Sequence, residues 1–257
     1  MRTDLHIHTS LSSDSKADMM ACCQAAVEAG LTHICFTEHL EHNPKDSGTG
    51  YYKREVYFDR LETARARFGG QLKILSGLEY AEPHLYPEDF AQALAQGGYD
   101  MVLGSVHWID NMAPYLPEEM TYSVETMFER YWAEMERTVE LGGFQVLSHM
   151  DFPKRYCKKC VYEEKTILRI LQKAVSRGIV MEINSSTFRQ GLGESMPGEA
   201  FVALYQKAGG KLVSIGSDSH FEQHTGADVD KAAALAEKYG LLPCVFEQGK
   251  AIAGQWG

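Results

Sequence analysis

Short apolar runs alternate along the chain with longer stretches in which apolar residues recur every three or four positions. The short runs predict seven buried strands, at residues 2 to 8, 32 to 37, 72 to 78, 100 to 106, 144 to 149, 178 to 184 and 211 to 217. The longer stretches predict helices near residues 17 to 29, 54 to 68, 87 to 96, 122 to 141, 167 to 175, 198 to 208 and 228 to 239. Ser15 and Asp18 predict a capping box at the first helix. One strand and one helix recur about every 37 residues, which predicts a parallel α/β protein, either an open doubly wound sheet or a barrel.

The composition indicates a chain that buries a large core and binds small partners. It has 257 residues, of which 44% are hydrophobic, and a formal net charge of −10. No linker interrupts the alternation, so we expect a single domain over residues 1 to 257. The acidic balance argues against a nucleic-acid partner or an anionic membrane surface and favours a small molecule.

Targeting signals and cysteine usage predict a cytoplasmic protein. No window approaches the roughly 20 apolar residues that span a bilayer, and the first ten residues contain no apolar signal segment. Six cysteines in a chain of this length predict reduced thiols rather than a disulfide framework. Cys157 and Cys160 form a CxxC pair, but no second pair completes a zinc site, so we interpret them as loop thiols.

Metal-competent side chains stand at or just beyond the carboxyl ends of nearly all the predicted strands. A single histidine in such a position is usually a hydrogen-bonded core residue, but this many at equivalent positions favour a shared site. His6 and His8 lie two residues apart and therefore project from the same side of a strand, as do Asp218 and His220. The candidate ligands are His6, His8, Asp14, His39, Glu79, His107, His149, Asp218 and His220.

Nine candidates exceed the ligand requirement of one ion, since a catalytic zinc takes about three protein ligands. The set therefore predicts two or three metal ions. Its ligand atoms are nitrogen and oxygen without thiolate, which leaves zinc, manganese and iron open.

The strand ends also form recognisable motifs: His6-Ile7-His8, Thr37-Glu38-His39, Gly77-Leu78-Glu79, Ser105-Val106-His107, Ser148-His149 and Ser217-Asp218-Ser219-His220. Together they resemble the polymerase and histidinol phosphatase (PHP) superfamily from residue 4 to residue 220. The resemblance implies a distorted, TIM-like (β/α)7 barrel that holds three divalent metals. It implies one ion bound by His6, His8, Glu79 and Asp218, a second by Glu79, His107 and His149, and a third by Asp14, His39 and His220.

Within that superfamily, the size of the chain and the segment NSSTFR at residues 184 to 189 are similar to the histidinol-phosphate phosphatases of histidine biosynthesis. This resemblance implies hydrolysis of L-histidinol phosphate to L-histidinol and phosphate. Metal ions suit such a reaction, because they lower the pKa of a bound water to about 7 and make a hydroxide available to attack phosphorus.

Phosphate binding and proton donation to the leaving group require further residues, and two arginines and two of the metal-site residues are the candidates. Arg155 and Arg189 follow predicted strand ends, and a guanidinium pairs well with phosphate, although a solvated surface role is the alternative. The alkoxide leaving group requires a proton donor. Asp218 and His220 stand at the metals and are the candidate catalytic residues, although both are also expected to be ligands.

Two other functions fit the same residues. A PHP phosphatase or phosphodiesterase acting on nucleotides or oligonucleotides would favour a basic or base-stacking groove, and the sequence has no obvious basic run. A non-catalytic, metal-stabilised module of a larger assembly would not require a complete ligand set. Phosphate release from a generic aryl phosphate would separate this module from both enzymes, and the sequence leaves the oligomeric state open.

Overall fold

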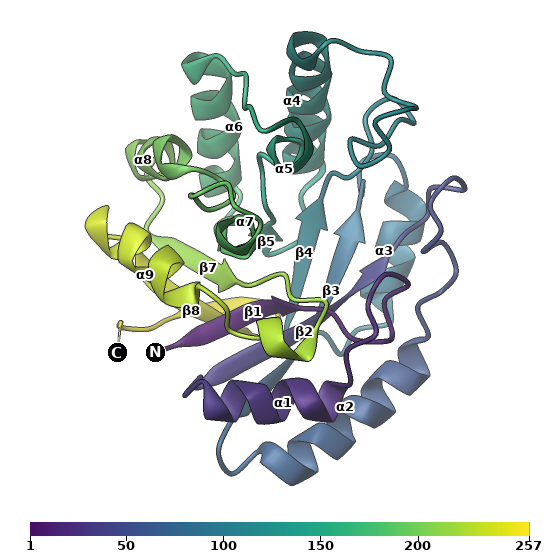
Figure 1. The fold of residues 1–257 in the computed structure, drawn as a ribbon, viewed down its shortest axis with the longest axis vertical. Coiled ribbons are helices and arrows are strands. Elements are labelled where there is room, and N and C mark those ends of the chain that lie inside the picture. The colour runs from purple at the N-terminus through teal and green to yellow at the C-terminus, as the bar shows by residue number, and fades with distance from the viewer. Residues whose placement is uncertain (257) are drawn as a thin grey trace.

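A sheet of parallel strands forms the centre of the protein, and the helices lie outside it (Figure 1). The computed structural model describes residues 1–256. The predicted strands are present as β1 (Thr3–Ile7), β2 (His33–Leu40), β3 (Lys73–Ala81), β4 (Met101–Ser105), β5 (Val146–Leu147), β6 (Val180–Asn184) and β7 (Leu212–Gly216). They pair in chain order and each pair is parallel, which confirms the predicted α/β architecture.

The two ends of this series of strands meet through a short contact. Ile7 forms a parallel bridge with Ser219, which follows β7. The Asp218 amide donates to the carbonyl of His6 at 2.8 Å, and the His8 amide donates to that of Ser219 at 2.9 Å. The barrel therefore closes only locally, beside the candidate ligands, which accounts for its distortion.

Two further strands extend the sheet beyond the predicted seven. Strand β8 (Leu242–Glu247) runs parallel to β7, and β9 (Lys250–Ala253) returns antiparallel to β8. The pattern analysis missed them because Pro243 interrupts the first and every residue of the second is exposed. Cys244 and Phe246 of β8 are buried in an apolar cluster that includes interior residues such as Leu75 of β3.

The seven predicted helices are present within a few residues. They are α1 (Met19–Glu28), α2 (Arg54–Phe68), α3 (Pro87–Ala95), α4 (Val124–Leu141), α6 (Glu164–Ser176), α8 (Glu199–Lys207) and α9 (Val229–Lys238). Three short helices were not predicted: α5 (Lys154–Cys157), α7 (Ser186–Arg189) and the 3-10 turn η1 (Glu222–His224). No helix within residues 1–256 has the length and apolar character required to cross a membrane.

The predicted capping box is wrong. Helix α1 begins at Met19, and the side chain of Asp18 caps it by accepting a hydrogen bond from the Ala21 amide at 3.0 Å. Ser15 instead donates to the carbonyl of His220 at 3.0 Å. It therefore ties the loop after β1 to the loop after β7, a contact that local sequence spacing cannot reveal.

The interior face of β3 has apolar packing at its amino end and a candidate metal ligand at its carboxyl end. Leu75, Gly77 and Glu79 alternate along one side of this strand, and all three are buried. A Cβ built on Gly77 would lie 2.5 Å from the sulfur of Cys35 on β2, so the barrel is too narrow there for a side chain. An apolar layer therefore fills the amino half of the barrel, and Glu79 stands at its carboxyl end.

Candidate metal centre

Glu79 occupies the middle of a cluster of imidazoles contributed by four neighbouring segments. Its Oε1 lies 2.9 Å from His149 Nε2 and 3.4 Å from His107 Nε2. Its Oε2 lies 3.1 Å from His6 Nε2, 3.3 Å from His8 Nε2 and 3.2 Å from His39 Nδ1. The carboxylate is fully buried. One side chain thus joins ligands that the family resemblance divides among three metal ions.

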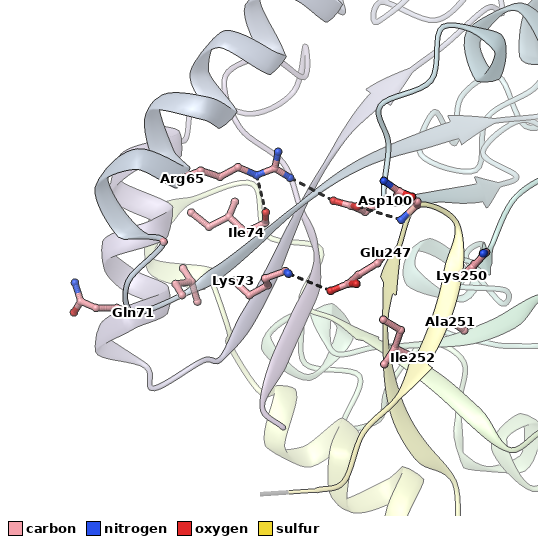
Figure 2. A pocket seen from close by; sticks show the side chains of 12 residues that line it. Arg65, Gln71, Lys73, Ile74, Asp100, Glu247, Lys250, Ala251 and Ile252 are labelled. Atoms are coloured by element: carbon pink, nitrogen blue, oxygen red, sulfur yellow. Dashed lines mark hydrogen bonds and ion pairs between the residues drawn. The ribbon is translucent and has the colours of Figure 1, made fainter.

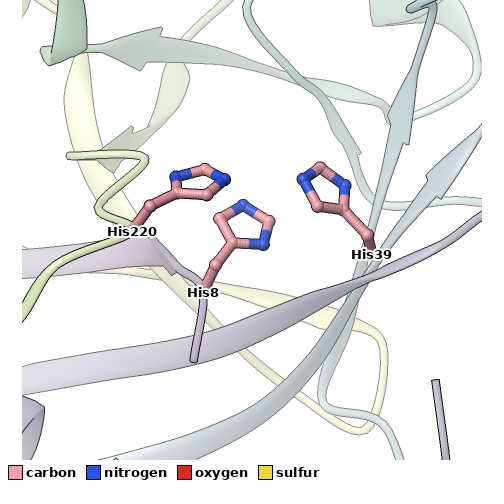
Figure 3. A group of neighbouring side chains, drawn as sticks. All are labelled: His8, His39 and His220. Carbon is pink, nitrogen blue, oxygen red and sulfur yellow. The ribbon is translucent and has the colours of Figure 1, made fainter. Parts of the chain in front are cut away.

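A second group of side chains lies at the outer edge of the first. The ring of His8 stacks between those of His39 and His220, with centroid distances of 4.2 and 4.3 Å (Figure 3). Asp14 Oδ2 lies 3.0 Å from His220 Nε2 and 3.5 Å from His39 Nε2, and its side chain is 54% exposed. The outer group is therefore open to solvent, whereas the group around Glu79 is closed.

The donor atoms of the inner group fit a bound cation. Burial, followed by the charges of His39 and His220, lowers the pKa of His8 well below its usual value, so this imidazole is neutral and keeps a lone pair. Its Nε2 is buried without a hydrogen-bond partner and faces carboxylate oxygens of Glu79 and Asp218. Hydrogen-bond acceptors that face each other in a water-free interior, with no donor between them, destabilise the fold. A metal ion bound between them would serve as the partner of both.

The electrostatics of Glu79 agree with this fit. Burial opposes ionisation, but the positive charges of His6 and His39 hold the pKa of Glu79 well below its usual range. Conversely, the pKa of His39 is raised to about 10 against the effect of burial, first by Asp14 and then by Glu79. A site that stabilises protons on its imidazoles attracts positive charge, and metal ions binding there would displace those protons.

Asp218 joins the metal ligands to the two arginines. It has a left-handed backbone, with φ at +53°. Burial opposes its ionisation, but Arg155 and then His6 keep the pKa of Asp218 well below its ordinary value. Arg155 Nη2 donates to Asp218 Oδ2 and, at 2.7 Å, to the hydroxyl of Ser186. Arg189 Nη2 donates to the Asp218 carbonyl at 2.8 Å. Both arginines therefore converge on the same ligand.

Glu182 is a positioning residue that the sequence analysis missed. Its Oε1 lies 2.7 Å from His6 Nδ1, and its Oε2 accepts a hydrogen bond from the His149 amide at 2.7 Å. A Cβ on Gly216 would lie only 2.4 Å from Glu182 Oε1, so the glycine provides the space for this contact. A carboxylate behind a histidine fixes the orientation of the ring and raises its basicity as a ligand.

A small cavity opens over the metal candidates. It has a volume of about 270 Å³, and Arg155 is the only lysine or arginine among its lining residues. Seven of the nine candidate ligands and several aromatic and acidic side chains complete the wall: Asp14, His39, Glu79, His107, His149, Asp218, His220, Glu41, Asp46, Tyr115, Phe152 and Tyr156 are among them.

A larger cavity, of about 980 Å³, lies at the amino end of β3 beside the β8–β9 hairpin (Figure 2). Four of its five charged groups are paired with each other: Arg65 lies 3.3 Å from Asp100, and Lys73 lies 3.1 Å from Glu247. The cavity has no histidine in its lining. Size alone therefore does not identify the reactive site, which lies at the opposite ends of the strands.

Comparison with known proteins places the chain in a family. Residues 4–186 match the model of the PHP domain, and the chain belongs to that family. It is 25% identical to the histidinol-phosphatase of Lactococcus lactis, over 93% of this chain and 92% of that protein. It is 28% identical to a probable histidinol-phosphatase of Clostridium acetobutylicum, over 95% and 96% of the two chains.

A solved structure agrees with the fold. The crystal structure of histidinol phosphate phosphatase from Lactococcus lactis, in complex with Zn, L-histidinol and phosphate, matches with a TM-score of 0.86. The two chains are 24% identical, and the match covers 98% of each. The distorted barrel that the family resemblance implied is therefore confirmed, while the individual ligand assignments stay predictions.

Proposed function

We propose that this chain is a metal-dependent phosphomonoesterase that hydrolyses L-histidinol phosphate to L-histidinol and phosphate. The observation that carries the proposal is the convergence of five imidazoles on the buried carboxylate of Glu79, beneath a small cavity with one arginine. The relatives named as histidinol-phosphatases match over nearly their whole length, which supports this choice of ester. The whole chain would act as one catalytic domain.

Three divalent ions, of zinc, manganese or iron, would bind here. We assign His6, His8, Glu79 and Asp218 to one ion, Glu79, His107 and His149 to a second, and Asp14, His39 and His220 to the third. When bound, such ions supply Lewis acidity and lower the pKa of a water molecule that attacks phosphorus. Glu182 would keep His6 in its ligating orientation.

The chain's own residues would hold the ester and release the alcohol. Arg155 lines the cavity and has a buried Nε without a partner, which leaves a donor for a phosphate oxygen. Arg189 likewise has a buried Nη1 without a partner. Asp218 and His220 line the cavity and are the candidate catalytic residues. Because Asp218 is held ionised, His220 is the candidate that would donate a proton to the leaving alkoxide. The small cavity favours a compact ester over an oligonucleotide.

A panel of phosphate monoesters, assayed with purified and metal-analysed protein, tests the proposed function. We expect L-histidinol phosphate to give a higher kcat/KM than nucleotides or an aryl phosphate. Equal turnover of nucleotides would contradict the choice of substrate. Absence of phosphate release from every ester, with metals bound, would favour the non-catalytic module instead.

The arginines provide a test of phosphate binding that the metal ligands do not. Loss of one charge-assisted contact should cost roughly tenfold to 150-fold in kcat/KM for Arg155→Ala and Arg189→Ala. Each Arg→Lys variant should recover only part of this loss, because lysine restores the charge without the planar fork. Steady-state kinetics and inhibition by inorganic phosphate would measure both effects.

Metal content should stay at the parental level in all four arginine variants. Arg169→Ala is a suitable control, since Arg169 pairs with Glu136 on the exposed surface. Parental kinetics in both alanine variants would remove these arginines from the site. A loss of metal together with activity would instead indicate that they act by holding Asp218.

A further inference from the structure

A buried carboxylate lies behind His8 and His39 without belonging to the proposed ligand set. Glu38 directly precedes His39 on β2, and its side chain is fully buried. Since successive residues of a strand point to opposite faces, Glu38 and His39 point in opposite directions. We propose that Glu38 is a positioning residue that acts through Ser12 to keep the proton of His8 on Nδ1, so that Nε2 can bind a metal ion. This inference rests on the proposed metal assignment.

A tight turn after β1 places two hydroxyl groups beside Glu38. The turn is closed by the Ser12 amide, which donates to the Thr9 carbonyl at 2.8 Å. Glu38 Oε1 accepts a hydrogen bond from the Thr9 hydroxyl at 2.7 Å. Its Oε2 accepts one from the Thr9 amide at 3.0 Å and one from the Ser12 hydroxyl at 2.6 Å. All three donors are neutral, and such donors are what allows a carboxylate to be buried, so the hydroxyl proton of Ser12 is committed to Glu38.

The oxygen of Ser12 also contacts two groups of the candidate metal centre. The His39 amide donates to Ser12 Oγ at 3.0 Å, and His8 Nδ1 lies 3.2 Å from the same oxygen. A serine hydroxyl has one proton to donate and two lone pairs that accept. Glu38 takes the proton, and the His39 amide occupies one lone pair. The contact with His8 is therefore a hydrogen bond only if Nδ1 carries the proton of the ring.

The second ring nitrogen of His8 agrees with this assignment. Its Nε2 is buried without a hydrogen-bond partner, 3.3 Å from Glu79 Oε2 and 3.6 Å from Asp218 Oδ1. A neutral imidazole has one N–H group and one lone pair, so a proton on Nδ1 leaves the lone pair on Nε2. That lone pair then faces the two carboxylates assigned to the same ion. The Glu38–Ser12–His8 relay thus holds the ring in the form that a metal ion requires.

Glu38→Gln should reverse the relay at nearly constant side-chain size. Thr9 offers two donors, so the amide oxygen of the glutamine would face Thr9 and its NH2 group would face Ser12. Ser12 would then accept from this NH2 group and from the His39 amide, and its own proton would turn to Nδ1 of His8. The ring proton would move to Nε2, where the metal ion should bind. Ser12→Ala would instead leave Nδ1 without its acceptor.

Nuclear magnetic resonance of the metal-free protein tests the position of the proton directly. In protein labelled with 15N-histidine, at mildly alkaline pH, the 15N chemical shifts of an imidazole report which of its nitrogens carries the proton. The signals that disappear in His8→Asn belong to His8. We expect the proton on Nδ1 in the parent and on Nε2 in Glu38→Gln. A proton on Nε2 in the parent, or on Nδ1 in both proteins, would overturn the relay.

Zinc affinity provides a second measurement that does not depend on turnover. Competition with a chromophoric chelator should show that Glu38→Gln and Ser12→Ala each bind one equivalent of Zn²⁺ roughly 10-fold to 100-fold more weakly than the parent. Ser76→Ala is the matched control, because this buried serine also donates to a carboxylate, that of Asp100 at 3.0 Å, but lies near the amino end of β3. It should lower the Tm without changing zinc affinity or the His8 tautomer.

The outcomes separate the relay from a purely structural role and from the proposed function. Parental zinc affinity in both Glu38→Gln and Ser12→Ala would overturn the relay. An equal loss of affinity in Ser76→Ala would also overturn it, since the effect would then follow from lower stability. A parent that shows the expected tautomer and zinc affinity but releases no phosphate from any ester would contradict the phosphatase function and leave the relay in place.

Discussion

Glu79→Gln is expected to remove more activity than any single histidine substitution in the cluster. The carboxylate lies within 3.4 Å of ring nitrogens from five histidines, and the substitution removes its charge without changing its shape. Replacing a residue behind a ligand already costs roughly 10-fold to 100-fold in metal affinity, so losing a shared ligand should cost on the order of 1,000-fold or more in kcat/KM. Metal analysis and kinetics on the same preparation would measure this.

Two controls strengthen the Glu79 experiment. Glu79→Asp keeps the charge but shortens the side chain, so it should retain more metal than Glu79→Gln. Glu62→Gln removes a carboxylate that pairs with Arg65 at the surface, and it should match the parent. Parental metal content and kinetics in Glu79→Gln would exclude Glu79 from the site.

The ligand positions could be predicted because the repeated architecture brings strand ends together. His39, Glu79 and His107 stand at or just beyond the ends of consecutive strands, and parallel pairing places His39 directly beside Glu79 in the register. No knowledge of side-chain packing was needed for that step. The strand and helix periodicities were sufficient to predict that the candidate ligands lie at the carboxyl ends of the strands.

The supporting residues could not be predicted in the same way. Glu182 lies in the middle of a buried strand, and its role depends on a glycine of β7 and a histidine of β1 that are distant in sequence. Asp46 lies in a loop, and its contacts with Trp108 and Tyr115 span more than 60 positions. Such contacts arise from tertiary packing, which local patterns do not encode.

The position of the two arginines could be predicted, but the direction of their side chains could not. Sequence position predicted that Arg155 and Arg189 lie at the carboxyl face, and both lie beside Asp218. Only Arg155 lines the cavity, however, and Arg189 approaches Asp218 from its backbone. The face of the barrel can thus be predicted from strand order, while the direction of a long side chain depends on its neighbours.

Removal of the metal ions should abolish activity and lower thermal stability together. Without cations, the site buries Glu79 and Asp218 against His8 Nε2, which has no hydrogen-bond partner. Metal that binds only the folded state adds about 2.7 kcal/mol per site at 100 times its Kd, which corresponds to roughly 5–10 °C in Tm for a chain of this size. Chelation followed by metal analysis, kinetics and calorimetry would measure both losses.

Readdition of metal to the chelated protein identifies the cause of these losses. If the ions stabilise the native state at this site, zinc or manganese should restore the parental Tm and activity, with two to three equivalents bound. The same titration on Glu79→Gln should raise the Tm less, because this single substitution weakens the binding of more than one ion. Full activity in protein that retains less than about 0.1 equivalent of metal would contradict the proposed chemistry, since no serine or cysteine nucleophile beside a free base was identified in the sequence.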